Sequence, residues 1–574
     1  MTTEGTAVEG GLDEPTELEP EQGTLDLAHP EDRHTRADWE RETAKVLRKA
    51  RRMGDDDPDE LVWDKLTRTT LDGIVLPPLG TPELLEGLQT AGRPARAGEW
   101  DIRAHLADGE AKAVNEEALL DLEGGVTSLW VAAGPDTDFA ALLKGVFVDL
   151  APVVLDPTGD AAATARAFLD WAGDLELHPA TNLGLPAFDA DVARLASDRG
   201  VLAFVIDATV VHDRGGSDAQ ELGWAMATAA TVLRAATEAG LPVAEAAALV
   251  EFRHAVTDEQ FTSIAKLRSA RRLWARMQEL SDAEPVPMRL HAVTSRPMMT
   301  RYDPWVNMLR TTVAAFAAGV GGADSVTVLP FDSALGRPDT FGRRIARNTS
   351  HLLISESHVA RVSDPAGGAY AVEKLTDDLA AAAWAVLGEL EEQGSGEWWD
   401  AAIADVVAAR EKQVATRKRP LTGLSEFPNL AETLPERSGP GLGVTSYGAS
   451  FEALRDDPAQ AHVFLATLGP VAAHTARATF ATNLFAAGGV AVDVAGATDG
   501  VESLLAAYDG QAVVCLAGAD AVYAEWGEAA AAALREAGAT RVVVAGKPTD
   551  YSDDACAMGV DALAFLTRTR EALA

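Results

Sequence analysis

The chain has 574 residues, of which 47% are hydrophobic and 24% are charged, and its formal net charge is −39. This length exceeds what a single core normally supports, so we expect two or more domains. The negative charge argues against a surface for nucleic acid or for an anionic membrane, although a local cationic pocket for a small anion is not excluded.

No apolar run is long enough to span a bilayer, and the acidic N-terminus lacks the basic and apolar pattern of a secretory signal. Cys515 and Cys556 are the only cysteines, which is too few for a disulfide framework and suits a reducing compartment. We therefore expect a cytoplasmic protein that binds neither nucleic acid nor membrane.

Residues 1–37 are rich in Glu, Asp, Gly, Pro and Thr and hold few large apolar side chains. They cannot bury enough surface to offset the entropy lost on ordering, so we predict a disordered acidic tail. Residues 38–97 are expected to form an N-terminal arm. An amphipathic helix over 38–52, with Val46 and Leu47 on its apolar side, would precede an extended segment.

Residues 98–395 alternate short β-branched runs with longer amphipathic runs, which predicts a (β/α)8 TIM-type barrel in the α/β class. In such barrels the chemistry lies beyond the C-terminal ends of the strands. The predicted strands are 126–134, 146–151, 175–179, 201–209, 248–256, 288–294, 324–331 and 360–362. Helices are predicted over 217–239, 258–280, 304–320 and 341–355, and the first two are the clearest.

Residues 396–460 are predicted to be a helical linker, with a helix over 398–416. The glycines around Pro440 mark a boundary near the end of this linker. No strand precedes these glycines and no helix opens at them, so we interpret them as linker residues and not as a nucleotide-binding loop.

Residues 461–574 alternate strands with alanine-rich helices, which predicts a flavodoxin-like, doubly wound sheet of five strands. The predicted strands are 462–469, 490–496, 512–518, 541–547 and 561–566.

Several motifs in fixed order carry a resemblance to a known family. They are Arg289-x-His291, PFDSAL (330–335), RIARNTSHLL (344–353) and DPAGGAYAVE (364–373). Together they resemble the methylmalonyl-CoA mutase family. The resemblance implies an acyl-CoA mutase-type barrel, a cobalamin-binding-type C-terminal domain, and an N-terminal arm that packs on a partner subunit. The alternative for the arm, a surface helix and linker on its own barrel, stays open.

The segment AKLRSARRLWARM (265–277) is similar to a helix of the same family. Its Lys266, Arg268 and Arg271 could contact a ligand, but we expect them to lie on a solvated outer face.

The cofactor-binding positions of the family are altered in this chain. The family carries Asp-x-His-x-x-Gly after the first strand of the C-terminal domain, where the His coordinates cobalt and the Asp orients it. Here the corresponding residues are Ala472, His474 and Arg477. His474 is the only candidate metal ligand, and we interpret it as a surface histidine at a helix start. Asp32-Arg33-His34, the only Asp-x-His, lies in the tail and lacks the glycine.

Two further cofactor motifs of the family are incomplete. The Ser-x-Leu motif begins with Val514 and keeps Leu516, and the paired glycines after the fourth strand are reduced to Gly546. We therefore expect this chain to hold no cofactor of its own.

The substrate positions implied by the resemblance are also incomplete. The tyrosine that the family presses against the substrate is missing, while His212 and Arg289 are retained. Asp324 stands where the family has glutamine, and a carboxylate there is expected to repel an acyl-CoA carboxylate. We expect no catalytic residue, with His212, Arg289 and Asp324 as vestiges of a site.

Other catalytic constellations are not found in the sequence. Gly546-Lys547 is followed by Pro548, which rules out a phosphate-binding P-loop, and there is no zinc-binding histidine pair or nucleophile elbow.

The resemblance implies the small, non-catalytic subunit of a heterodimeric enzyme that interconverts methylmalonyl-CoA and succinyl-CoA by radical rearrangement. Adenosylcobalamin and the chemistry would belong to the large subunit. Two alternatives stay open. One is a catalytic acyl-CoA mutase that binds cobalamin by an atypical route, for which His474 and His212 are the only support. The other is a non-enzymatic scaffold or regulator.

Overall fold

The structure, a computed structural model, describes residues 33–88, 96, 98–107 and 109–574. The chain divides into two compact units. One contains Met1–Arg68 and Val75–Leu79, and the other contains Thr69–Ile74 and Gly80–Ala574. Most of the predicted tail lies outside the described residues. In the part of the chain that is described, every helix is too short or too polar to cross a membrane.

The first unit opens with α1 (Arg36–Lys49), which begins at a capping box formed by Thr35 and Asp38. The last residues of the predicted tail are therefore helical. Ala44 and Leu47 of this helix form a small core with Met53 and with Val62, the first residue of α2 (Val62–Leu66). The prediction that Val46 packs beside Leu47 is wrong, because Val46 is 66% exposed. The remaining elements here are η3 (Asp59–Leu61), β1 (Arg68–Thr69) and β2 (Val75–Leu76).

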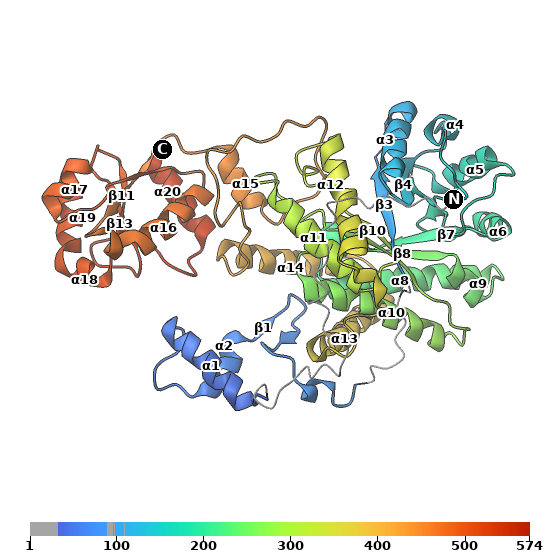
Figure 1. Ribbon diagram of the computed structural model, residues 1–574, viewed down its shortest axis with the longest axis horizontal. Coiled ribbons are helices and arrows are strands. Elements are labelled where there is room, and N and C mark those ends of the chain that lie inside the picture. The colour runs from blue at the N-terminus through green and yellow to red at the C-terminus, as the bar shows by residue number, and fades with distance from the viewer. Residues whose placement is uncertain (1–32, 89–95, 97, 108) are drawn as a thin grey trace, which may run out of the picture. The chain divides into compact units, whose positions relative to one another are not determined.

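The second unit contains a closed barrel of eight parallel strands, in the order β10-β3-β4-β5-β6-β7-β8-β9. Figure 1 shows these strands with helices outside them. The TIM-type prediction is thus confirmed. The strands are β3 (Asp101–Leu106), β4 (Ser128–Ala133), β5 (Val153–Pro157), β6 (Asn182–Leu185), β7 (Leu202–Asp207), β8 (Val250–Val256), β9 (Arg289–Thr294) and β10 (Ser325–Thr327).

Three predicted strands of the barrel are wrong. Segments 146–151 and 175–179 are loops, and 360–362 overlaps a single 3-10 turn, η6 (Val359–Arg361). The strands β3, β5 and β6 take their places. β3 was missed because it has no apolar run: Asp101, Arg103 and His105 alternate with its outward-facing residues. The segment 146–151 is apolar, but it is a loop that leaves Phe147 72% exposed.

Helices form the outer layer of the barrel. The four helices predicted over 217–239, 258–280, 304–320 and 341–355 are confirmed. Helix α13 packs along α8 and α10. The elements are η4 (Pro82–Leu85), α3 (Ala111–Glu123), α4 (Phe139–Leu142), α5 (Ala161–Ala172), α6 (Ala190–Arg199), α7 (Thr209–Asp213), α8 (Asp218–Glu238), α9 (Val243–Ala248), α10 (Gln260–Leu280), α11 (Val306–Val320), α12 (Thr340–His351), the π-turn η5 (Leu352–Glu356) and α13 (Tyr370–Gln393).

The predicted linker contains α14 (Glu397–Ala415) and α15 (Ala449–Asp456). Beyond it lies a five-stranded parallel sheet in the order β12-β11-β13-β14-β15, which is the flavodoxin order. Its strands are β11 (Val463–Thr467), β12 (Val492–Val494), β13 (Val513–Ala517), β14 (Arg541–Ala545) and β15 (Asp554–Cys556). Its helices are α16 (Val471–Ala487), α17 (Val501–Ala507), α18 (Asp520–Val522), the π-turn η7 (Tyr523–Gly527), α19 (Glu528–Glu536) and α20 (Ala562–Leu573).

The fifth predicted strand, 561–566, is wrong. It is the start of α20, because the Asp561 side chain accepts a hydrogen bond from the Ala564 N–H and so caps a helix. The fifth strand is instead the short β15.

The domain boundaries at 395/396 and 460/461 and the extended character of the arm stay predictions.

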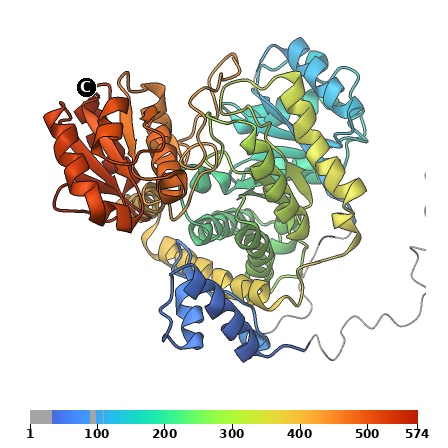
Figure 2. The same cartoon turned by 60° about the vertical axis from the view of Figure 1, so that its left-hand side comes forward.

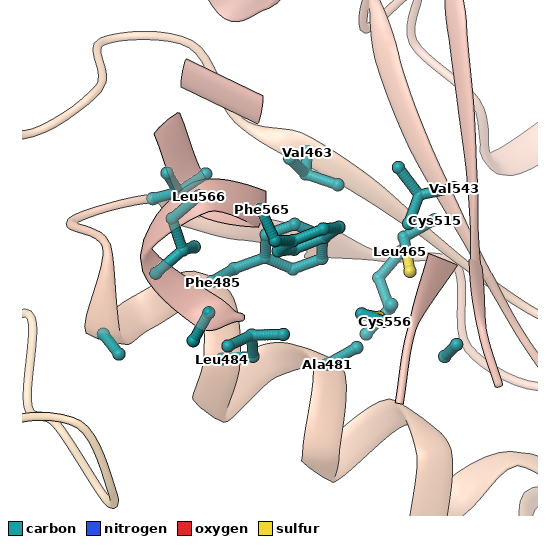
Figure 3. Packing of buried hydrophobic residues seen from close by; sticks show 14 of the residues in the cluster. Val463, Leu465, Ala481, Leu484, Phe485, Cys515, Val543, Cys556, Phe565 and Leu566 are labelled. Carbon is teal, nitrogen blue, oxygen red and sulfur yellow. The ribbon is translucent and has the colours of Figure 1, made fainter. Parts of the chain in front are cut away.

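Helices cover both faces of this sheet (Figure 2). On one face the rings of Phe485 in α16 and Phe565 in α20 lie 5.7 Å apart (Figure 3). Cys515 and Cys556 are buried in the same cluster as free thiols. The other face packs against α17 and α19 through Leu504 and residues of α19.

A tight turn at residues 70–73 is fixed to the start of α8. The Asp72 carboxylate accepts a hydrogen bond from the Ala219 N–H at 3.3 Å. Burial, and then the nearby carboxylate of Asp218, raise the pKa of Asp72 to about 6, although Ser217, Ala219 and Lys266 oppose this shift. The folded chain therefore prefers the neutral form of this carboxyl group.

Asp72→Asn should stabilise the chain more at pH 8 than at pH 5, by a difference of about 1 kcal/mol. The stability that neutral Asp72 supplies is complete below its ordinary pKa of 3.8 and is lost as the pH rises through about 6. Urea unfolding at both pH values measures this. Asp160→Asn, at an exposed N-cap that also binds a backbone N–H, is the control. If Asp72→Asn changed the free energy of unfolding by the same amount at pH 5 and at pH 8, the raised pKa assigned to Asp72 would be contradicted.

Candidate functional site

The interior of the barrel is filled by charged side chains from alternating strand positions. On β8, Glu251 and Arg253 contact residues across the interior, whereas Phe252 packs on Trp274 of α10 and His254 binds Glu221 of α8. This alternation is the normal two-residue period of a strand. The unusual feature is that the inward positions are ionised, since barrel cores are usually branched and apolar.

The lower layer of the interior is an ion pair between β3 and β8. Arg103 donates to both oxygens of Glu251, at 2.7 and 3.3 Å, and its Nε donates to Ser128 Oγ at 3.0 Å. Arg289 Nε lies 3.4 Å from the same carboxylate. Burial alone would raise the pKa of Glu251, but Arg103 and then Arg289 lower the pKa of Glu251 overall. The carboxylate is therefore ionised and bound on both sides.

The upper layer centres on Arg253. Its guanidinium lies 3.9 Å from the ring centre of Trp130, and Nη1 donates to Asp207 at 2.7 Å. Its Nε donates to His291 Nδ1 at 3.2 Å, so His291 carries its proton on Nε2 and donates to Thr327 Oγ1 at 2.8 Å. Burial and the neighbouring arginines hold the pKa of His291 well below its usual value, which keeps the ring neutral.

His212 is held in α7, directly after β7, and is a satisfied buried histidine. Its Nε2 lies 2.7 Å from Ser295 Oγ and 3.3 Å from the Tyr447 hydroxyl, and its Nδ1 lies 3.5 Å from Glu221. The order Ser–His–Glu is that of a hydrolytic triad. However, Ser295 is only 1% exposed and its Oγ also accepts the Met298 N–H, so the hydroxyl is committed to the fold.

Arg289 and Asp324 are placed far from His212 along the strands. Arg289 is the first residue of β9, and Asp324 immediately precedes β10. The Asp324 carboxylate accepts hydrogen bonds from the Leu290 N–H at 2.7 Å and from Arg271 at 3.0 Å. Both residues therefore lie at the N-terminal ends of the strands, opposite the end where barrels carry their chemistry. The structure does not bring the three vestigial residues together.

The expectation of a solvated outer face for α10 is wrong, because its cations are buried. Lys266 binds Asp218 and Glu221, each at 2.8 Å. Arg268 binds Asp364 and Glu373 of the DPAGGAYAVE motif, each at 2.8 Å. These pairs join α10 to its neighbours, so two of the family-like motifs serve the frame of the barrel.

In the C-terminal domain, Arg477 of α16 lies at the C-terminal ends of β13 and β14. Its Nη1 donates to the Gly518 carbonyl at 2.6 Å, and its guanidinium lies 4.9 Å from the Tyr523 ring centre. A Cβ on Gly546, whose φ is +150°, would lie 3.4 Å from the same guanidinium. Ligands of such sheets bind beyond the C-terminal ends of the strands, and here the Arg477 side chain lies at that edge.

Tyr523 makes hydrogen bonds at the same C-terminal edge of the sheet. Its hydroxyl accepts the Gly518 N–H at 3.0 Å and lies 2.9 Å from the carbonyl oxygens of Leu516 and Ala545. Burial raises the pKa of Tyr523, so the hydroxyl keeps its proton for those carbonyls. The ends of β13 and β14 are thereby tied together by a protein side chain.

The remaining cofactor positions are structural. His474 lies in the first turn of α16, and its Nδ1 donates to the Gly469 carbonyl at 3.1 Å. The prediction of a surface histidine is wrong, because His474 is only 7% exposed. Ala472 supplies no acceptor for its ring, and Val514 lies in the hydrophobic core. The Nδ1 hydrogen bond leaves Nε2 as the uncommitted ring nitrogen, so the imidazole by itself does not exclude a metal. The misfit with a cobalamin rests on Arg477, whose side chain stands where the family has the glycine that lets the cofactor approach.

A cavity of about 590 Å³ lies beside the barrel, between α3, α12 and linker residues 438–442. Its wall includes Arg343 and Arg347 of the RIARNTSHLL region. Sequence reasoning did not find it, although two arginines one turn apart on α12 were a usable signal. Among the residues that the structure describes, no group of three His, Cys, Asp or Glu side chains is arranged to hold a metal ion.

Comparison with known proteins places these observations in a family. A family model described as methylmalonyl-CoA mutase matches residues 199–461. The methylmalonyl-CoA mutase small subunit of Streptomyces virginiae is 43% identical, over 96% of this chain and 98% of that protein. The small subunit of Propionibacterium freudenreichii subsp. shermanii is 34% identical, over 96% of each. The mitochondrial mutase of Bos taurus is 38% identical over 32% of this chain and 25% of that protein.

Arg103→Met should lower the free energy of unfolding by about 3–5 kcal/mol, because it leaves Glu251 buried without its main partner. The double variant Arg103→Met/Glu251→Leu should recover most of this loss, since it removes both charges. Denaturant unfolding measures both, with Arg194→Met, from an exposed pair with Asp198, as a control expected to cost under about 1 kcal/mol. A single variant within 1 kcal/mol of the parent would contradict the role assigned to the pair.

Proposed function

The chain belongs to the methylmalonyl-CoA mutase family, and from this premise we propose that it is the non-catalytic small subunit of a heterodimeric mutase. The holoenzyme interconverts methylmalonyl-CoA and succinyl-CoA by radical carbon-skeleton rearrangement. Adenosylcobalamin and the reacting groups belong to the large subunit, and the heterodimer works in the cytoplasm. The small subunit contributes a folded frame and an interface.

The observation that carries this proposal is the filled interior of the barrel. Arg103, Glu251 and Arg253 project into the space where a substrate would have to lie, and each is bound to opposite charges or to Trp130. Displacing such a pair would leave buried charges unpaired, which costs several kcal/mol. A substrate would have to supply that energy before any chemistry began.

The C-terminal domain supports the same proposal. The group that the family implies would have to displace Arg477 from Gly518 and Tyr523, and would meet a His474 side chain that is only 7% exposed. No step of the reaction is therefore assigned to residues of this chain.

The alternatives differ in what they require of the two histidines. A catalytic chain with atypical cobalamin binding needs His474 or His212 to be available. Both ring nitrogens of His212 have partners, in Ser295 and Glu221, whereas His474 uses only Nδ1 and would act in a domain where Arg477 is bound to Gly518. A scaffold or regulator unrelated to the mutase would have no need of a large subunit. Isolation of the chain with or without that partner separates this alternative from the proposal.

The isolated chain should not bind adenosylcobalamin, because the Arg477 side chain, bound to the Gly518 carbonyl, stands where the family has glycine. Titration followed by the corrin absorbance spectrum measures this, with the complex containing the large subunit as the positive control. A spectral shift that saturates at micromolar cofactor would overturn the prediction.

Removing residues 1–68 should weaken association with the large subunit at least tenfold, which is about 1.4 kcal/mol. The reason is that this unit exposes apolar residues, among them Val46 at 66%, and obligate interfaces are large and apolar. Co-purification of the two subunits and a binding titration measure the effect.

The matched control for this truncation removes only residues 1–32, which should leave association unchanged. Circular dichroism checks that the barrel of each variant stays folded. A one-to-one complex of full affinity after removal of residues 1–68 would show that the arm is not the contact.

A further inference from the structure

The barrel wall is incomplete where its first and last strands meet. β10 pairs with β3 only at Ser325↔Asp101 and Val326↔Ile102, whereas β3 continues beside β4 to Leu106. Above that level an edge of β3 is left without a strand partner. The His105 carbonyl oxygen instead accepts a hydrogen bond from Arg343 Nη1, at 3.4 Å. A seam is therefore open on the C-terminal half of the wall.

The 590 Å³ cavity passes through this seam. Successive residues of a strand point to opposite faces, yet Ile102 and Ala104 line the cavity together with Arg103 and His105. Both the outer and the inner side of β3 thus contribute to its wall. Its volume lies within the range of roughly 300–1,000 Å³ of small-molecule sites, although the axis of the barrel itself is filled.

The wall of the cavity is apolar with one cationic side. Ile102, Val126 and Leu329 supply part of the apolar surface, and Arg296 reaches it from the barrel. The cationic side is formed by three arginines that share two carboxylates, so it carries an excess positive charge. The arginines are Arg337, Arg343 and Arg347, and the carboxylates are Glu117 and Asp121.

Two details indicate that this charge is available to a ligand. The Nε–H of Arg347 is buried and has no hydrogen-bond partner within the described residues, and an unsatisfied buried donor is costly. The side chain of Arg337 is 39% exposed, so it can change partner without a large rearrangement. In a chain with a net charge of −39, a local excess of cations beside an apolar cavity is a specific feature.

We propose that this seam cavity binds a small amphiphilic anion, a short alkyl or acyl chain that ends in a carboxylate or a phosphate. The chain would lie against the apolar wall, and the anionic group would bind Arg337 and Arg347, whose planar guanidinium groups suit either headgroup. The site lies beside the filled axis, whose Arg103 and His105 form part of its wall, and its lining includes no residue of the C-terminal domain. It does not depend on whether the chain is catalytic.

The test is calorimetric titration of the full-length chain with four probes: hexyl phosphate, hexanoate, 1-hexanol and inorganic phosphate. One or both amphiphilic anions should bind with a Kd below about 1 mM, and the tighter of the two identifies the headgroup. 1-Hexanol and inorganic phosphate should each bind at least tenfold more weakly, because each lacks one half of the ligand.

Two variants with matched controls locate the binding. Arg337→Gln should weaken binding at least fivefold, whereas Arg344→Gln, which changes an exposed arginine on α12, should not. Ala346→Leu, which fills the cavity from α12, should weaken it at least tenfold, whereas Ala381→Leu on the exposed face of α13 should not. Thermal unfolding confirms that each variant folds. Absence of binding by both anions, or binding unchanged in Arg337→Gln and Ala346→Leu, would overturn the proposal.

Discussion

The ion pair between Arg103 and Glu251 is the interaction on which the barrel depends. It joins β3 to β8 across the interior, over 148 residues of sequence, with both side chains fully buried. A pair of this kind is costly to bury and more costly to break, so every neighbouring polar group must be arranged to satisfy it. Ser128 and Arg289 do so, and the layer of Arg253 and His291 continues the same network above.

This network explains how a chain can keep the frame of an enzyme family while its reactive positions change. The ion pairs of Lys266 and Arg268 on α10 hold the outer layer, and the paired charges inside hold the strands. Catalysis needs an open, preorganised site for the cofactor and the substrate. In this chain charged side chains fill the barrel interior, and Arg477 donates a hydrogen bond to the Gly518 carbonyl at the end of β13.

The sequence predicted both architectures, because most strands are apolar runs and the longer helices have clear amphipathic periods. The sequence-based predictions failed where the polarity of a segment does not match its burial or its secondary structure in the folded chain. β3 was missed because its inward residues are charged, and the partner that neutralises Arg103 is distant in sequence. Residues 561–566 are apolar enough for a strand, but the Asp561 cap makes them a helix. The altered cofactor positions were visible in the sequence, whereas the burial of His474 and the seam beside β3 follow only from tertiary packing.

The most direct test of a non-catalytic small subunit is the number of corrinoids bound by the purified heterodimer. The complex, reconstituted with excess adenosylcobalamin and freed of unbound cofactor, can be measured by its corrin absorbance against the protein concentration. One cofactor for each heterodimer is the result that follows from our proposal that the large subunit alone holds it. Two for each heterodimer would contradict the assignment of Arg477 and His474 to the fold of this chain.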